Sequence, residues 1–487
     1  MKKGAVVLFF LILVIPALNS SLLSQEKFRK SPPYPDPLPE LNLPPIESAF
    51  LSNGLGIFVV PRHNPPIITL RLIVLAGESS SPSRFPGTAT LTAKMLSRGT
   101  LYLSHDELEE RIESMGGRFT TSTFPDYSMF TLVFSEKYLD QGLNILSKMV
   151  LQPSFSRREI ENVKRSMYYE LLEKGSDSEF AAKKLLFRIL FQEHPYQKST
   201  YSEDVIKNLN QKLISSFYEK YYRPNNARLI LTGNLNLSTA SRKVSSYLNT
   251  WEKKEMKFSF LPPPEPNDQL KICFVDIPRK KDAAIYMGNI MAPLKDDDYF
   301  PLLVLDQVLG GTPTSRLFMN LRESKGYAYY AFTDIELFKA CGVFMARAKV
   351  RPEVVYDSVM EILNETKKII EKKIPSLEIE QAKSYLIGNF PLQVETMDDL
   401  SLKAAQIQAF QLGEEHWNKY YENIMLIDSN KVYEIAQKYP FLTPVVVIAG
   451  DKNIIVDHLR EFDKVEIYNH KGVLQYSIQK EISHENR

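Results

Sequence analysis

Two stretches of this 487-residue chain recur about 220 residues apart, and this spacing limits what the chain can fold into. The run that starts at Glu159, EIENVKRSMYYEL, is comparable to EIEQAKSYLIGNF, which starts at Glu378. The strand-like run LILTGNL, which contains Gly233, likewise matches VVVIAGDK, which contains Gly450. Two matches at nearly the same offset indicate an internal duplication, so the sequence predicts two similar halves.

Both halves show the same order of hydrophobic patterns. In the first half, alternating strand patterns over 49–62 and 68–77 precede two amphipathic helices and a hairpin. Long helical patterns follow over 156–174, 178–192 and 203–222, and a buried strand closes the half. This order predicts an α+β fold in which helices are layered on sheets.

The N-terminus has the pattern of an export signal. Lys2 and Lys3 precede an apolar run that is shorter than the roughly 20 residues needed to span a bilayer. We therefore expect a signal peptide over 1–24 and an exported protein, periplasmic or associated with the cell envelope. The alternative is an N-terminal anchor that is not cleaved.

Proline-rich stretches mark the remaining boundaries. The segment 25–47 is a predicted tether, and the four prolines within 256–268 predict a semi-rigid linker. These stretches place the first half over 48–255 and the second half over 269–482.

The composition excludes some classes of partner and scaffold. A formal net charge of +2 gives no reason to expect nucleic acid or an acidic membrane surface as a partner. Contact with a membrane is expected only through the N-terminal segment, if that segment is retained. Cys273 and Cys341 lie in apolar strand-like runs and are interpreted as two buried thiols in preference to a disulfide.

The stretch 87–100, GTATLTAKMLSRGT, predicts an amphipathic helix whose chemistry decides the function. Ala89, Ala93 and Leu96 share one apolar stripe, and Gly99 is placed for a left-handed C-terminal cap. Positions 90–94 read Thr-Leu-Thr-Ala-Lys, so this turn carries neither an imidazole nor a carboxylate.

The surroundings of this helix resemble the M16 peptidases, the family of insulinase and mitochondrial processing peptidase. The resemblance covers about residues 48–480 and implies two homologous M16-type α/β-layered halves that face each other as a clamp. In that family the helix carries H-x-x-E-H, in which two His bind zinc and the Glu activates water.

The flanking glycines align these three motif positions with Thr90, Ala93 and Lys94, and the family's third ligand with Glu170. A protonated ammonium cannot coordinate a metal, and one carboxylate does not hold catalytic zinc. The resemblance therefore implies a non-catalytic member that binds no cofactor of its own.

A second motif of the family is retained in the other half, GGTPTSRLFMNLRESKGYAYY. The motif positions Gly310, Gly311 and Arg316 match, as do Arg322 and Tyr329, the pair that contacts substrate at the zinc in active M16 enzymes. A guanidinium and a phenol can hydrogen-bond a peptide carbonyl or the oxyanion formed from it. We expect Arg322 and Tyr329 to bind substrate.

The resemblance implies a chain with no autonomous activity that works within a zinc metalloendopeptidase. It would enclose unfolded peptide and contribute Arg322 and Tyr329 to a zinc-bearing M16 paralogue in a heterodimer, and zinc is expected only in that partner. One alternative is a purely structural or binding protein with no role in proteolysis. The other is a peptidase with a different metal site, although no two of the seven His are spaced i, i+4.

Overall fold

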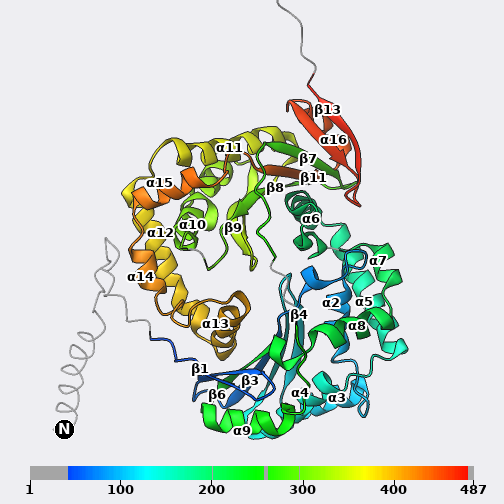
Figure 1. The fold of residues 1–487 in the computed structure, drawn as a ribbon. Helices are drawn as coiled ribbons and strands as arrows, with labels where there is room; N and C mark the ends of the chain where they lie inside the picture. Colours follow the sequence, from blue (N-terminus) through cyan, green and yellow to red (C-terminus); the bar gives the residue numbers. More distant parts are fainter. Residues whose placement is uncertain (1–41, 200, 257–260, 296, 481–487) are drawn as a thin grey trace, which may run out of the picture. The chain divides into compact units, whose positions relative to one another are not determined.

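The first half is built on a six-stranded sheet with the order β1-β2-β6-β3-β5-β4 (Figure 1). The structure, a computed structural model, describes residues 42–480 except 200, 257–260 and 296, so the predicted signal and most of the tether lie outside the described residues. The strands are β1 (Glu47–Phe50), β2 (Gly56–Pro61), β3 (Ile67–Val74), β4 (Arg118–Thr123), β5 (Ser128–Ser135) and β6 (Ala227–Gly233).

The second half contains a seven-stranded sheet with the order β13-β12-β7-β11-β8-β10-β9. Its strands are β7 (Lys271–Asp276), β8 (Ala283–Met291), β9 (Ala328–Leu337), β10 (Gly342–Val350), β11 (Val445–Gly450), β12 (Lys464–Tyr468) and β13 (Leu474–Gln479). Cys273 and Cys341 are buried and free, which confirms the interpretation as buried thiols.

Five strands of each sheet repeat one topology. The order β2-β6-β3-β5-β4 in the first sheet corresponds to β7-β11-β8-β10-β9 in the second. In both sets the first two strands are parallel and each later pair is antiparallel. The predicted duplication is therefore confirmed in the strand order and in the strand directions.

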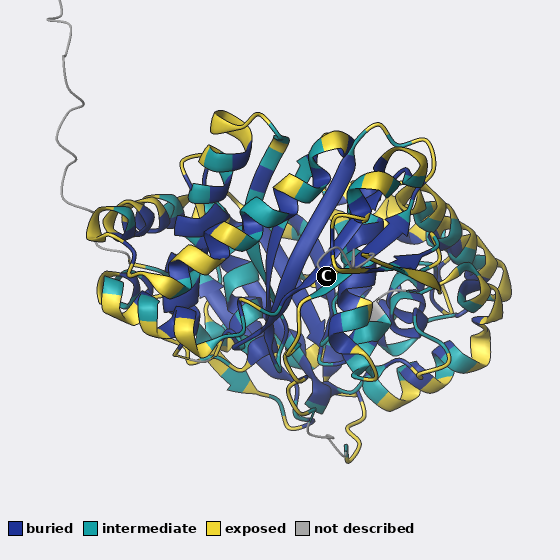
Figure 2. Ribbon diagram, turned by 90° about the horizontal axis from the view of Figure 1, so that it is seen from above, coloured by how far each residue is buried: buried dark blue, intermediate teal, exposed yellow. Residues whose placement is uncertain are grey.

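Helices cover the sheets and leave the central strands buried (Figure 2). Those before the linker are α2 (Thr88–Met95), α3 (His105–Ser114), α4 (Leu139–Leu151), α5 (Arg157–Gly175), α6 (Ser178–Phe191), α7 (Glu203–Asn208), α8 (Gln211–Tyr221) and α9 (Leu237–Leu248). Those after it are α10 (Tyr299–Asp306), α11 (Val355–Glu371), α12 (Ser376–Asn389), α13 (Met397–Phe410), α14 (Tyr420–Met425), α15 (Ser429–Lys438) and α16 (Lys452–Leu459). Two further segments, η5 (Gln307–Gly311) and η6 (Phe318–Ser324), are π-helical.

Two predicted helices differ from the observed ones for local reasons. The helix predicted over 203–222 is split into α7 and α8, because the Asn210 side chain accepts a hydrogen bond from Leu213 N and starts a new helix. The helix predicted over 87–100 ends at Met95, after which the chain forms tighter turns such as Leu96 N to Ala93 O.

The halves exchange one helix each. Helix α6 precedes the linker in sequence but packs against β8 and β11 of the second sheet. Helix α13 belongs to the second half in sequence but packs against β3 and β6 of the first sheet. Apolar side chains of each helix join the core of the sheet they cover, with Leu186 beside Val447 and Ala404 beside Ile230 in the same buried clusters.

One buried cation fixes the position of α13 on the first sheet. Arg71, in β3, is 3% exposed and donates from Nη2 to Asp398 Oδ1 at 2.7 Å and from Nε to Ser401 Oγ at 3.1 Å. Burial lowers the pKa of Arg71, and the charge of Asp398 partly offsets that effect. The ion pair thus ties a strand of one half to a helix of the other.

We predict that Asp398→Ala lowers the free energy of unfolding by about 2–3 kcal/mol, because it leaves a buried guanidinium without its counter-charge. Equilibrium urea unfolding measures the effect. Asp457→Ala is the control, since it removes only the exposed pair with Arg460 and should leave the midpoint nearly unchanged. Similar shifts for both variants would contradict the role assigned to Asp398.

Candidate functional site

The start of α2 is held by a buried carboxylate. Gly87, the N-cap residue, has a φ of 91° and no side chain to cap the helix. Glu78 takes over this task, since Gly87 N and Thr90 N donate to its carboxylate at 2.9 and 2.7 Å. The hydroxyls of Thr90 and Ser81 also donate to Glu78, which is 4% exposed.

The four positions aligned with the zinc motif lie on α2 and α5, which contact each other. Thr90 and Lys94 are one helical turn apart and half-buried, whereas Ala93 is fully buried. Lys94 Nζ donates to Glu170 Oε1 at 2.7 Å, and Ser166 Oγ donates to the same oxygen at 3.1 Å. The structure therefore brings Lys94 and Glu170 together as an ion pair.

This set of side chains does not fit a catalytic zinc ion. An ammonium takes the place of an imidazole ligand, and its positive charge already neutralises Glu170. Thr90 commits its hydroxyl to Glu78, so it does not supply a ligand either. Within the residues that the structure describes, no three His, Cys, Asp or Glu side chains gather closely enough to hold a metal.

The electrostatics around Glu170 favour its ionised form. Burial raises the pKa of Glu170, but the hydrogen bond and charge of Lys94 outweigh burial and leave the pKa below its ordinary value. Tyr201 is also near, and its pKa is raised by burial and by the charge of Glu170. The pair is partly exposed, with 29% of the Lys94 side chain and 41% of the Glu170 side chain open to solvent.

Arg322 and Tyr329 also lie side by side, at the end of η6 and the start of β9. Gly326, with a φ of 62°, turns the chain between these two elements. Arg322 Nη1 donates to the backbone carbonyl of Tyr329, and the guanidinium lies over the ring of Phe318 at 5.4 Å. Both side chains stay about half exposed, at 48% for Arg322 and 56% for Tyr329.

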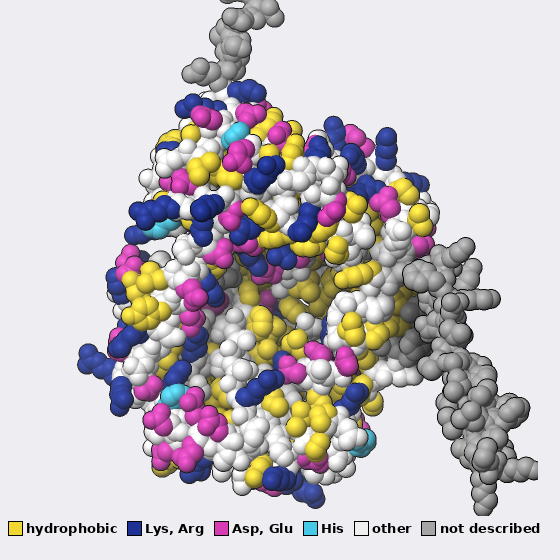
Figure 3. All heavy atoms as spheres, turned by 180° about the vertical axis from the view of Figure 1, so that it is seen from behind, with side chains coloured by type: hydrophobic (Ala, Val, Ile, Leu, Met, Phe, Trp, Pro, Cys, Tyr) yellow, Lys and Arg dark blue, Asp and Glu magenta, His cyan; other side chains and the backbone are white. Residues whose placement is uncertain are grey.

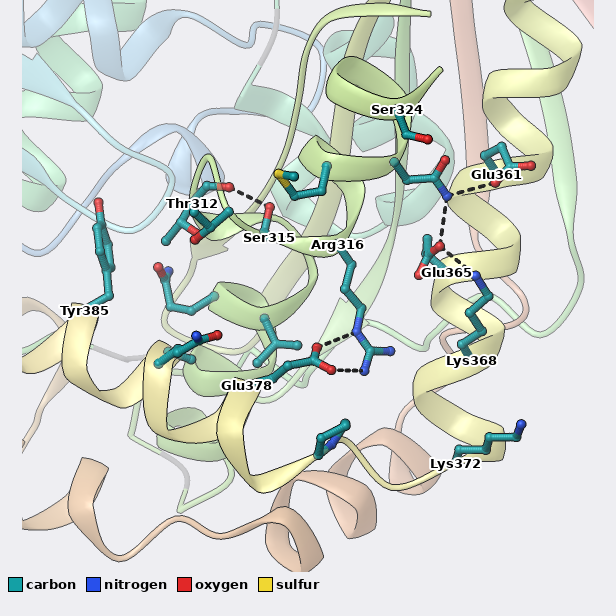
Figure 4. A pocket seen from close by; sticks show the side chains of 18 of the residues that line it. Thr312, Ser315, Arg316, Ser324, Glu361, Glu365, Lys368, Lys372, Glu378 and Tyr385 are labelled. Atoms are coloured by element: carbon teal, nitrogen blue, oxygen red, sulfur yellow. Dashed lines mark hydrogen bonds and ion pairs between the residues drawn. The ribbon is translucent and has the colours of Figure 1, made fainter. Parts of the chain in front are cut away.

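A charged groove of about 1190 Å³ lies along the helical turns that carry Arg322, between η6, α11 and α12 (Figure 4). Arg316 forms a bidentate ion pair with Glu378 of α12, at 2.7 and 3.1 Å. Asn320 Nδ2 donates to Glu361 and Glu365 of α11, at 2.9 and 2.8 Å. The Arg316–Glu378 pair holds the turn just before η6 against α12, and the Asn320 contacts hold η6 against α11. Together they fix the backbone that carries Arg322.

The two groups of predicted residues remain separate. Among the described residues, no hydrogen bond or ion pair links Lys94 or Glu170 to Arg322 or Tyr329. The sequence analysis did not identify Glu78 as part of this site. A helix that starts at a glycine has no capping side chain, and this indicates that another residue must accept the hydrogen bonds of its first N–H groups.

We predict that replacing Thr90 and Lys94 together by His creates a zinc site. The two imidazoles would lie one turn apart beside Glu170, which gives the two-His, one-carboxylate set that zinc accepts. Metal analysis after dialysis should find close to one zinc per chain in this variant and far less in the wild type. Adding Glu170→Gln should remove the metal, and retention of zinc without Glu170 would contradict the inferred geometry.

We also predict a pH-dependent stability difference between the wild type and Glu170→Gln. Because the folded pKa of Glu170 lies below its ordinary value of 4.5, ionised Glu170 stabilises the fold above that value and stops doing so as the pH falls through the lower pKa. For a partly exposed pair we expect about 0.5–1 kcal/mol at pH 7. Thermal unfolding between about pH 3 and 7 tests this, and an equal difference at both ends would contradict it.

Two family models match the chain. The model described as insulinase, peptidase family M16, covers residues 58–204, and the model described as the peptidase M16 inactive domain covers residues 208–386. Together the two models span more than half of the sequence, and each of them matches mainly one half of the chain.

Among curated proteins, the chain is 25% identical to "Non-peptidase homolog YmxG" of Helicobacter pylori, over 69% of this chain and 78% of that protein. It is 23% identical to "Zinc protease PqqE" of the same organism, over 74% of this chain and 82% of that protein. It is also 22% identical to the mitochondrial-processing peptidase subunit alpha of Rattus norvegicus, over 71% of each chain.

Solved structures share the fold. A protease from Helicobacter pylori superposes with a TM-score of 0.79 at 20% identity, covering 84% of this chain and 100% of the other. A peptidase M16 inactive domain from Pseudomonas fluorescens gives 0.78 at 20% identity, covering 84% and 98%. The family models, the relative named as a non-peptidase and the lost zinc ligands agree, and the chain belongs to the M16 peptidase family as a non-catalytic member.

Proposed function

We propose that this protein is the non-catalytic subunit of a heterodimeric M16 zinc metallopeptidase. In this role it encloses unfolded peptide and supplies Arg322 and Tyr329 to the zinc site of its partner. The observation that carries the proposal is the geometry of this pair. Two half-exposed hydrogen-bond donors lie side by side, Arg322 on η6 and Tyr329 on β9, while an ion pair fills the position of the zinc ligands.

The chemistry of the pair suits a peptide substrate. Arg322 donates from Nη1 to the Tyr329 carbonyl, and its Nε lies 3.8 Å from Glu323 Oε1. Within the contacts of the described residues, the N–H groups of Nη2 therefore remain available to a ligand. Together with the exposed phenol of Tyr329, they could hydrogen-bond a peptide carbonyl and stabilise the oxyanion that forms when a zinc-bound water attacks it.

The partner follows from what this chain lacks. A zinc-bearing M16 paralogue would provide the metal and the general base, and zinc is expected only in that subunit. The two relatives from Helicobacter pylori support this arrangement, because one organism has both a protein named a non-peptidase homologue and one named a zinc protease.

We also propose that the pair works outside the cytoplasm, in the periplasm or at the cell envelope. The support is the basic and apolar pattern over residues 1–24, which is typical of an export signal.

A structural or binding role without proteolysis is the second candidate. It is favoured by the contacts that Arg322 already makes within its own chain, to the Tyr329 carbonyl and to the ring of Phe318. In this case Arg322 would only stabilise the junction between η6 and β9.

The decisive experiment is to co-express this chain with a paralogue that carries an intact H-x-x-E-H motif and to assay cleavage of an unfolded peptide. We predict that the pair cleaves, that this chain alone does not, and that Arg322→Ala lowers kcat of the pair by roughly 100-fold, the scale of one lost oxyanion donor. Tyr329→Phe should reduce cleavage as well, because it removes the phenolic hydroxyl and keeps the ring.

Arg460→Ala is the matched control, since this exposed Arg pairs only with Asp457 on the surface of α16. It should leave cleavage unchanged. A stable pair that cleaves equally well with Arg322→Ala would favour the structural role, and robust cleavage by this chain alone would rule out both candidates.

A further inference from the structure

Three parallel strands of the second sheet end at one edge, and the loops that follow them carry cations. Strands β11 and β12 both pair with β7 in the parallel sense. Because the carboxyl ends of parallel strands meet at the same edge of a sheet, the loop 277–282, the start of α16 and the turn 469–473 are neighbours.

Hydrogen bonds and a cation–π contact tie these loops together. Arg279 has a φ of 67°, and its backbone N–H donates to Asp451 Oδ2 at 2.6 Å. Lys452 N donates to Asp276 Oδ1 at 3.1 Å, and Lys452 Nζ lies 5.1 Å from the centre of the Tyr476 ring. From the first half, Arg188 Nη1 reaches the carbonyl of Gly472 at 2.7 Å.

Six cations gather here, and we call this surface the basic edge. They are Arg188, Arg279, Lys280, Lys281, Lys452 and Lys471. Within the part of the chain that the structure describes, none of the six forms an ion pair with a carboxylate within 4.0 Å, although Glu203 acts on Lys471 from farther away.

The nearby acidic side chains accept hydrogen bonds or form ion pairs with other residues. The carboxylate of Asp451 caps α16 and holds Arg279 N, and that of Asp276 accepts from Lys452 N. Asp282 pairs with Lys349 at 3.2 Å, on the adjoining strand β10. Asp276 and Asp451 keep their negative charge while they accept these backbone hydrogen bonds, so they offset two of the six cations. The basic edge still carries an excess of positive charge, even though the whole chain has a net charge of only +2.

Apolar side chains stand exposed among these cations. In Figure 3, dark-blue cationic and yellow apolar side chains lie close together at the upper left, where β13 and α16 are found, with magenta acidic side chains among them. The exposed apolar residues of this region are Ile454 at 46%, Val473 at 50%, Leu474 at 50% and Tyr476 at 43%. An exposed mixture of aliphatic, aromatic and cationic side chains is typical of surfaces that lie at a bilayer interface.

We propose that the basic edge docks this protein on an anionic lipid surface. Lysine and arginine would contact the lipid head groups, while Leu474 and Tyr476 enter the boundary between head groups and acyl chains. Nucleic acid fits less well, because Ile454, Val473 and Leu474 are aliphatic and Tyr476 alone among these four exposed residues offers a ring on which a base could stack. No described helix is long and apolar enough to cross a membrane, so attachment through this part of the chain would be peripheral.

Flotation with lipid vesicles tests the proposal on the full chain. Vesicles of phosphatidylcholine with about 30% phosphatidylglycerol should bind the protein more tightly than pure phosphatidylcholine, and about 0.5 M NaCl should remove most of the difference. The comparison between the two lipids isolates the electrostatic part, because the N-terminal apolar run is present in both measurements.

Charge reversal of Arg279, Lys280 and Lys281 to Glu should lower partitioning onto anionic vesicles by at least about 100-fold, since each surface cation is worth about 5-fold. The matched control combines Lys367→Glu on α11 with Lys372→Glu and Lys373→Glu just after this helix, because the three changes alter the net charge equally at a different site. The control should retain most of the binding, and circular dichroism should show both variants folded.

Leu474→Ser with Val473→Ser tests the apolar part and should weaken binding in a way that salt does not change. Equal binding to both lipids, equal loss in the two triple variants, or binding to single-stranded DNA but not to vesicles would overturn the proposal. The loop variants should leave cleavage by the co-expressed pair intact, so this proposal and the proposed function can fail independently.

Discussion

The exchange of α6 and α13 is the constraint on which the arrangement of the described chain depends. Each sheet buries strands under a helix that the other half of the sequence provides, so neither sheet completes its core without its counterpart. Burial of apolar surface supplies the attraction, and the Arg71–Asp398 pair makes the position of α13 specific, because a buried guanidinium tolerates only a small set of placements. The halves are therefore similar in topology but not autonomous in packing.

At the position of the family's zinc site, the charge of Glu170 is still balanced by a cation, but the side chains present cannot bind zinc. A cation still faces Glu170, but it is an ammonium on a flexible side chain, which can neither polarise a carbonyl as a Lewis acid nor lower the pKa of a water molecule. The segment around Arg322 is braced by an ion pair to α12 and by hydrogen bonds to α11. Lys94 and Glu170 neutralise each other, whereas Arg322 and Tyr329 are half exposed and held in place. This difference is the reason why we propose a supporting role in a two-chain enzyme.

Local patterns in the sequence predicted local structure well. The hairpin of β4 and β5 depends on a few neighbouring residues, and it is present as predicted. The duplication predicted the repeated strand order. The exchange of α6 and α13 could not be predicted in this way, because an amphipathic pattern shows that one face is buried but not which sheet buries it. The contact between Lys94 and Glu170 could not be predicted for the same reason. The basic edge could not be predicted from the net charge, because that number sums the charges of the whole chain.

The four hydrogen bonds that Glu78 accepts have a consequence for how this helix tolerates change. They set the register of α2 from upstream, through Gly87, Thr90 and Ser81. Side chains one turn apart on the open face of α2 can then be exchanged while the backbone beneath them stays where it is. The position of α2 is in this way held by residues of the chain itself, so the chemistry of its open face can change without a change in the architecture.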